Sequence, residues 1–244
     1  MERRKRVNIN GKKNRTNNGG RGNGMVRFDD LIEIEPFTTN QELAFQAWDD
    51  GYNLILAGCA GTGKTFLGMY FALEDVLDPD TFYDQVVVVR SMVPTRDMGF
   101  LPGSKAEKEE AYTAPYLSIC EQLFEDKGSY GKAVVQNKIR FESTSFIRGT
   151  TWDNSIILVD EMQNLNFHEL DSVITRVGEN TKIIFCGDYK QSDFRFDDEK
   201  EGIHKFLAIC EQLRKFKIIT FNWEDIVRSD FVRDYLMTKE MLGY

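Results

Sequence analysis

Long apolar runs are absent from this chain of 244 residues, because no stretch approaches the roughly 18 residues of a membrane-spanning helix. The start MERRKRVNINGKK has no apolar region behind its basic residues, so we do not expect a secretory signal. Cysteines are few and widely spaced, at positions 59, 120, 186 and 210, which argues against a zinc site or a disulfide framework. We therefore expect a cytoplasmic protein with reduced thiols and no membrane partner.

Charge is unevenly spread along the sequence. Residues 1–24 hold eight basic side chains and one acid, a net of +7, which leaves −15 for the other 220 residues of a chain whose total is −8. The same segment is rich in Asn, Gly and Arg and poor in apolar residues, so we expect residues 1–27 to form a disordered basic arm. Such an arm is typical of nucleic-acid binding by counterion release, and the alternative is a tail that serves solubility alone.

Residues 28–244 alternate strand-like and helical patterns, with no internal repeat. Strand patterns, most of them continuous apolar runs, lie at 53–58, 85–90, 139–147, 156–160, 182–187 and 217–221. Helical patterns lie at 38–50 with a Thr cap, 63–77, 104–126 with an interruption at Pro115, 166–176, 202–214 and 229–241. This alternation predicts a single α/β domain, with a mainly parallel sheet covered by helices on both faces.

GCAGTGKT, residues 58–65, stands between the first strand and its helix and matches the phosphate-binding pattern GxxxxGK[ST]. Glycines let the backbone wrap an anion closely, and the loop amides with the helix N-terminus point at the phosphates. Lys64 would bring a positive charge to the β- and γ-phosphates, and the Thr65 hydroxyl would be a Mg²⁺ ligand. The residues expected to bind the nucleotide are Gly58, Cys59, Ala60, Gly61, Thr62, Gly63, Lys64 and Thr65.

Two adjacent acids, Asp160 and Glu161, follow the apolar run of the 156–160 strand in VDEMQN. Carboxylates at the end of a buried strand are costly unless a positive charge meets them. We predict that Asp160 holds Mg²⁺, directly or through water, and that Glu161 polarises the water that attacks ATP. In GDYKQSD, after the next strand, Gln191 is a candidate sensor of the γ-phosphate, and a plain Gly-Asp turn is the alternative. The transferred phosphoryl group needs a further cation, for which the candidates are Arg90, Arg148, Arg176 and Arg228.

Together these motifs make the chain resemble the PhoH-like P-loop ATPases, in particular a short phage-type member. The resemblance runs from about Phe37 to Leu242 and is carried by GCAGTGKT, VVVVRSMVP, GFLPGSKAEKEEAYTAPY, FIRGTTWDNSIILVDEMQN, ITRVG, GDYKQSD and EDIVRSDFVRDYL, in that order. It implies a RecA-like P-loop NTPase domain related to superfamily 1 helicases, with ATP and Mg²⁺ as ligands, in the host cytoplasm if a phage encodes it. It also implies that Gln41 reads the adenine, that Gln191 is the third-motif glutamine, and that Arg176 or Arg228 is an arginine finger.

A single core lacks the second domain that completes the site of a two-domain helicase. We therefore expect neighbouring copies in a ring to supply Arg228 in trans, and RNA or single-stranded DNA to be the partner of the ATPase. The alternative is a nucleotide-switched nucleic-acid-binding or regulatory protein with slow turnover. A ribonuclease would need an acid cluster separate from the P-loop, and a P-loop kinase would not need the Asp160–Glu161 pair and the GDxxQ pattern, which indicate water as the nucleophile.

Overall fold

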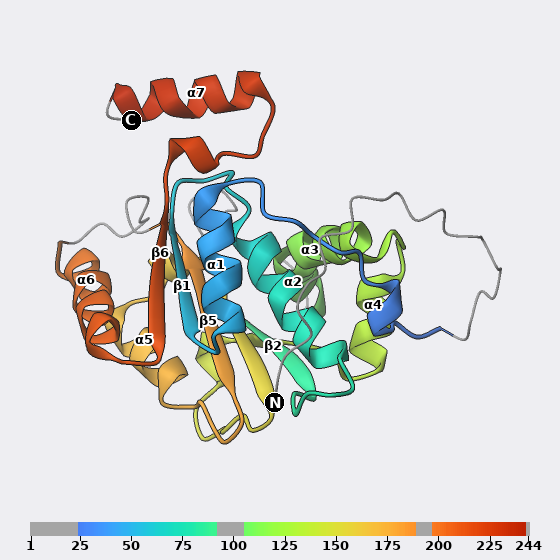
Figure 1. The fold of residues 1–244 in the computed structure, drawn as a ribbon. Coiled ribbons are helices and arrows are strands. Elements are labelled where there is room, and N and C mark those ends of the chain that lie inside the picture. The colour runs from blue at the N-terminus through green and yellow to red at the C-terminus, as the bar shows by residue number, and fades with distance from the viewer. Residues whose placement is uncertain (1–23, 92–104, 189–196, 243–244) are drawn as a thin grey trace.

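Six parallel strands form one sheet in the order β3-β2-β4-β5-β1-β6 (Figure 1). The computed structural model describes residues 24–91, 105–188 and 197–242. The strands are β1 (Asn53–Gly58), β2 (Gln85–Arg90), β3 (Ile139–Ser143), β4 (Ser155–Val159), β5 (Lys182–Gly187) and β6 (Phe216–Phe221). Because each strand alternates its side chains between the two faces, the sheet needs a helical layer on both sides.

Helices cover both faces of the sheet, and an apolar core lies on each face. The first face is covered by α1 (Thr39–Asp49), α2 (Lys64–Leu77), α3 (Lys105–Phe124) and α4 (Ser129–Val135). The second face is covered by α5 (Phe167–Ile174) and α6 (Asp197–Gln212). Leu54 of β1 belongs to the first core and its neighbour Ile55 to the second. The expected fold class, an α/β domain with helices on both faces of a parallel sheet, is confirmed.

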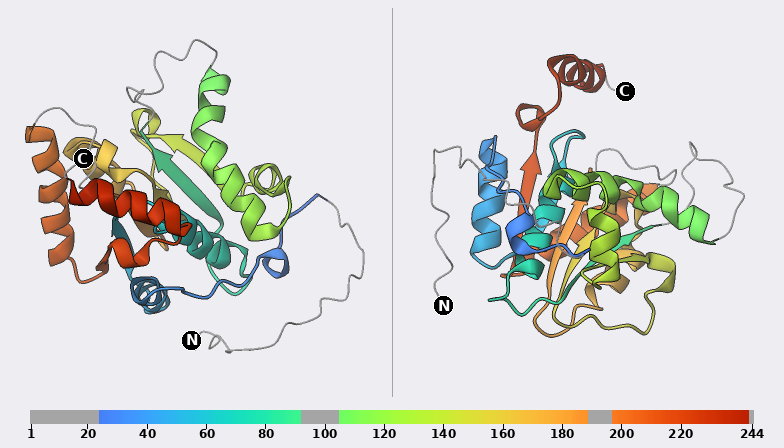
Figure 2. Two further views of the ribbon diagram at one scale, coloured as in Figure 1. Left: turned by 90° about the horizontal axis from the view of Figure 1, so that it is seen from above. Right: turned by 90° about the vertical axis from the view of Figure 1, so that its right-hand side faces the viewer.

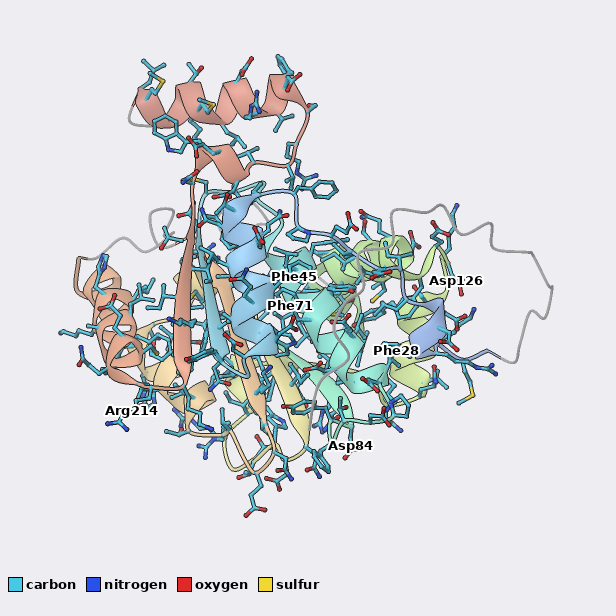
Figure 3. The ribbon with its side chains drawn as sticks, viewed as in Figure 1. Phe28, Phe45, Phe71, Asp84, Asp126 and Arg214 are labelled. Atoms are coloured by element: carbon cyan, nitrogen blue, oxygen red, sulfur yellow. The ribbon has the colours of Figure 1, made fainter. Side chains whose placement is uncertain are left out.

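Aromatic packing fixes α1 against α2 on the first face. Phe45 and Phe71 point toward each other between the two helices (Figure 3), with ring centroids 4.8 Å apart in an edge-to-face arrangement. Trp48 stacks on Phe71, with ring centroids 5.7 Å apart. These contacts bury large side chains and set the position of α2, whose first turn follows the phosphate-binding loop.

The carboxyl ends of all six strands lie at one edge of the sheet, where the expected motifs emerge. Four short 3-10 helices complete the described chain: η1 (Phe28–Asp30), η2 (Thr144–Phe146), η3 (Met162–Asn164) and η4 (Trp223–Asp225). The last helix, α7 (Asp230–Met241), lies above this edge and away from the two helical layers (Figures 1 and 2). No helix in the described ranges is long and apolar enough to cross a membrane.

Several element boundaries differ from the sequence prediction. Pro115 does not interrupt a helix, because α3 runs continuously through it. Pro115 and Ala111 are both exposed, so water can reach the Ala111 carbonyl that loses its partner, while Tyr112 and Tyr116 keep the helix packed on the core. The strand expected at 139–147 ends at Ser143, whose hydroxyl accepts a hydrogen bond from the Ser145 amide and starts η2. The short helix α4 was not predicted.

Candidate active site

The loop Gly58–Thr65 joins β1 to α2 in a conformation that needs glycine. Gly63 precedes α2 with a left-handed φ of 81°, and Gly58 has a φ of 119°. A Cβ added to Gly58 would lie 2.0 Å from the Phe221 carbonyl oxygen on the adjacent strand β6. The loop therefore starts against the backbone of β6 and turns sharply into the helix, which aims the amides at the N-terminus of α2 into the turn.

Lys64 lies within this loop. Its ammonium donates hydrogen bonds to the carbonyl oxygens of Gly58 at 2.7 Å and Cys59 at 2.6 Å. Burial lowers the pKa of the Lys64 ammonium, and the negative charge of Asp188 at the end of β5 acts in the opposite direction. The loop thus holds a partly buried cation beside its own amides, an arrangement that attracts a phosphate.

Thr65 and Asp160 connect the loop to β4. The Thr65 hydroxyl donates to Asp160 Oδ1 at 2.7 Å, although β5 lies between β1 and β4 in the sheet. Asp160 is 3% exposed. Burial raises the pKa of the Asp160 carboxyl, and the charge of the adjacent Glu161 adds to this effect. The two residues expected to hold Mg²⁺ are therefore in direct contact.

Tyr116 of α3 is a site residue that sequence reasoning missed. Its hydroxyl is buried and donates to Asp160 Oδ2 at 2.8 Å. Burial, and then the charge of Asp160, raise the pKa of Tyr116 well above its ordinary value. The TAPY stretch carried part of the family resemblance, but no local pattern showed that its tyrosine reaches a carboxylate 44 positions away.

Arg90, at the end of β2, lies beside the same group. Its side chain is hydrogen-bonded to Tyr116, and its guanidinium carbon lies 5.8 Å from the centre of the Tyr112 ring. Burial works to lower the pKa of Arg90, but Tyr116 and the charges of Asp160 and Glu161 outweigh it and raise the pKa. Of the four candidate arginines, Arg90 is thus placed next to both acids.

Glu161 precedes η3 as its N-cap residue with a left-handed φ of 52°, which is uncommon for a residue other than glycine. One oxygen of its carboxylate accepts a hydrogen bond from the Gln163 amide group. Gln163 Oε1 in turn accepts from the Asp188 amide at 3.0 Å. The side chain of Gln163 therefore joins the acid after β4 to the end of β5.

The donor set suits a magnesium nucleotide. Thr65 and Asp160 offer a hydroxyl and a carboxylate, the oxygen ligands that Mg²⁺ takes together with phosphate oxygens. Lys64 and the loop amides are placed for the phosphates. No cluster of three or more His, Cys, Asp or Glu side chains elsewhere in the described segments could hold a metal.

A family model for PhoH-like proteins matches residues 33–239. The chain belongs to the PhoH-like family. Relatives include PhoH2 of Bacillus subtilis, 36% identical over 179 residues, and PhoH of Escherichia coli K12, 31% identical over 211 residues. These alignments cover 70% and 84% of this chain but only 40% and 58% of the relatives. The chain thus spans about half the length of the curated relatives that it matches, and the predicted family is confirmed.

Similar solved structures include the large terminase of a thermophilic bacteriophage in complex with ADP, at 12% identity and a TM-score of 0.48, covering 82% of this chain and 49% of that one. The Hef helicase domain of Pyrococcus furiosus is similar at 15% identity and the same TM-score, covering 83% of this chain and 41% of that one.

Gln41, expected to read the adenine, lies against the loop with both ends of its amide in use. Its Nε2 donates to the Thr62 carbonyl at 3.3 Å, and its Oε1 accepts from the Phe37 amide at 2.8 Å. Thr38 caps the helix that carries it, as predicted. Gln41 is 3% exposed and supports the loop through its hydrogen bond to Thr62, while its adenine contact stays a prediction.

The remaining predicted residues are Arg228, Arg176, Arg148 and Gln191, and the three arginines lie in different places. Arg228 is beside the loop of its own chain, because its Cγ lies 3.2 Å from the position of a Cβ added to Gly61. Arg176 lies at the opposite edge of the sheet, where its carbonyl accepts from the Trp152 amide just before β4. The structure therefore does not bring Arg176 to the loop within one chain. Gln191 lies outside the described residues, and Arg148 is exposed after η2.

Proposed function

We propose that this chain hydrolyses ATP with Mg²⁺ and couples hydrolysis to binding RNA or single-stranded DNA. The observation that carries the proposal is the hydrogen bond between Thr65 and Asp160. It joins a phosphate-binding loop to an acidic strand end, and it leaves Glu161 as the next residue. A loop that only bound phosphate would have no need of two acids at that place.

Each residue has a separate task in this proposal. Lys64 and the amides of α2 neutralise the phosphates, while Thr65 and Asp160 provide the oxygen ligands of the metal. Bound Mg²⁺ would neutralise charge that develops on the β- and γ-phosphate oxygens. Glu161 accepts a proton from a water aligned with the γ-phosphorus, so that the oxygen of the water forms the new bond as the bond to the β-phosphate breaks.

The positions of Arg228 and Arg176 bear on which arginine a neighbouring copy would supply. Arg228 stands next to Gly61 of its own chain, which supports a contribution to the phosphates in cis. Arg176 could approach a nucleotide only from a neighbouring copy, because it lies at the other edge of the sheet. We therefore keep a homo-oligomeric ring as a proposal and assign the trans contact to Arg176 in place of Arg228.

Nucleic acid is the partner that the charge distribution favours. Residues 1–24 of the basic arm carry a net charge of +7 and the rest of the chain carries −15, so the arm is the segment suited to a polyanion. The second candidate, a nucleotide-controlled switch with slow turnover, uses the same loop. Glu161 favours hydrolysis over the switch, because a water-polarising acid serves no purpose in a protein that only senses nucleotide.

Steady-state ATP turnover tests the proposal, measured alone and with RNA, single-stranded DNA or duplex. We expect Mg²⁺-dependent turnover that rises with RNA or single strands, and no turnover in the Lys64→Ala variant. Deleting residues 1–24 should weaken binding of single strands and flatten its dependence on salt. Turnover equal to that of Lys64→Ala would rule out the ATPase, and turnover indifferent to every nucleic acid would rule out the coupling.

A further inference from the structure

Gln163 makes two hydrogen bonds that connect separate parts of the site. Its Nε2 donates to Glu161 Oε2, and its Oε1 accepts from the Asp188 amide at 3.0 Å. The orientation of the amide is fixed by chemistry, because a carboxylate needs a donor and a backbone N–H needs an acceptor. The side chain is 7% exposed, so water cannot easily replace either bond.

The end of β5 is shaped to receive this side chain. A Cβ added to Gly187 would lie 2.4 Å from Gln163 Oε1 and 2.7 Å from Met162 Cγ. Only glycine lets η3 approach so closely, and the approach is what brings Gln163 to the Asp188 amide. Strand β5 lies between β4, which precedes Glu161, and β1, which leads into the loop.

We propose that Gln163 is a positioning residue that holds the Glu161 carboxylate and ties it to the end of β5 at Asp188. This inference rests on the proposed ATPase function, since Glu161 is the base only if water is the nucleophile. Glu161 needs such a partner, because its own backbone is held at a φ of 52° and its side chain is half-buried. A movement at the end of β5 would then shift the carboxylate.

The end of β5 also affects Lys64, the cation of the phosphate-binding loop. Asp188 is the charge that most strongly opposes the loss of basicity that burial causes in Lys64. One short stretch, Gly187–Asp188, therefore influences the phosphate-binding cation through space and the water-polarising acid through Gln163. Its effect on both makes this stretch suited to align the two groups during turnover.

Two substitutions at Gln163 separate the two bonds. Gln163→Met keeps the length of the side chain and removes both bonds. Gln163→Glu keeps an acceptor for the Asp188 amide but removes the donor and sets a like charge beside Glu161. We expect kcat to fall roughly 10- to 100-fold in both variants, as when a residue that orients a reacting group is removed. The Kd for Mg·ATP should stay within about threefold, because the hydrogen bonds from Gln163 to Glu161 and the Asp188 amide do not involve Lys64 or Thr65.

A double-mutant cycle shows whether Gln163 acts through Glu161. In a Glu161→Gln background, Gln163→Met should cost no further turnover, because the carboxylate that it holds is already gone. The kcat–pH profile of Gln163→Glu should move its acid limb to higher pH, since two facing carboxylates bind a proton more readily. The matched control is Gln122→Met on the exposed face of α3, which should leave every parameter unchanged.

The outcomes decide between the possibilities. Turnover of Gln163→Met within twofold of wild type, or losses that add in the cycle, would overturn the inference. Exchange of the Asp188 amide with solvent gives a readout that does not depend on activity. It should be faster in Gln163→Met and stay slow in Gln163→Glu, and equal exchange in both would also overturn the inference. If the wild type shows no turnover, the ATPase proposal fails, and the role of Gln163 as a positioning residue fails with it, whatever the exchange result says about the bridge.

Discussion

Asp160 is a carboxylate whose buried position disfavours its charge. It is buried, the hydroxyls of Thr65 and Tyr116 each donate to one of its oxygens, and the positive charge of Arg90 favours its ionised form. Burial raises its pKa, and the neighbouring Glu161 adds to the effect. A carboxyl whose pKa is raised by folding lowers stability once the pH is high enough to ionise it. Asp160 therefore costs the fold stability at neutral pH.

Asp160→Asn should increase the free energy of unfolding at pH 7 in the presence of EDTA. The Thr65 and Tyr116 hydroxyls can each donate or accept, so both can adapt to the amide. For a chain of this size, Tm should rise by about 2–4 °C for each kcal/mol of relieved penalty. The gain should shrink as the pH falls toward about 4, where a carboxyl becomes protonated and uncharged. Thermal melts across this pH range measure it.

Asp126→Asn is the control with the opposite sign. The Lys132 ammonium, and then the Gly128 amide at 2.9 Å, hold the pKa of Asp126 below its ordinary value. Asp126 therefore stabilises the fold above its unfolded pKa, and this contribution is lost as the pH falls through its lowered folded pKa. The variant should melt slightly lower at pH 7. A Tm lower than that of wild type for Asp160→Asn at pH 7 would contradict the view that the ionised Asp160 carboxylate destabilises the fold.

Strands β1 and β6 and the segment that follows β6 meet at the carboxyl end of β1. Gly58 closes β1 next to Phe221 of β6, and the Cys59 amide donates to the Phe221 carbonyl at 3.2 Å. Further along, the Val227 amide donates to the Gly61 carbonyl at 3.1 Å. The phosphate-binding loop is therefore supported by the C-terminal part of the chain as well as by its own strand.

Gly58→Ala should destabilise the protein by about 2–5 kcal/mol, because the new Cβ meets backbone at 2.0 Å and the residue has a positive φ. Gly131→Ala is the matched control, since nothing lies within 4 Å of its Cβ position in α4. That variant should gain about 0.5–1 kcal/mol, as alanine is favoured over glycine inside a helix. Urea unfolding measures both, and equal stability of the two variants would contradict this view of the loop.

Elements with a strong local pattern were predictable from the sequence. The bounds of β1, β2 and β5 match the prediction, because each is a continuous apolar run. The seven-residue helix α4 was missed, since the glycine at its third position weakens any helical signal. The Thr65–Asp160 contact could be expected from the two motifs. The contacts of Tyr116 and Gln163 could not, because they depend on which helix and which strand lie beside Asp160 and Glu161.

At the scale of the whole molecule, the sheet order brings the site together. Placing β5 between β1 and β4 sets the loop, the acidic pair and Asp188 along one edge. Helix α3 reaches this edge through Tyr116, whose hydroxyl donates to Asp160. Helix α7 reaches it through Leu236, whose Cδ1 lies 3.5 Å from the position of a Cβ added to Gly61. Residues far apart in sequence thus converge on one group of phosphate-binding and acidic side chains, which is the basis of the proposed ATPase.

Glu161→Gln tests the central claim most directly, because it removes the water-polarising acid and keeps the size of the side chain. Mg·ATP affinity and phosphate release are measured on the same preparation, with wild type beside it. We predict a Kd within about threefold of wild type and phosphate release slower by roughly two orders of magnitude or more, the scale of a positioned base. Phosphate release at the wild-type rate would contradict the account and remove Glu161 from the reaction.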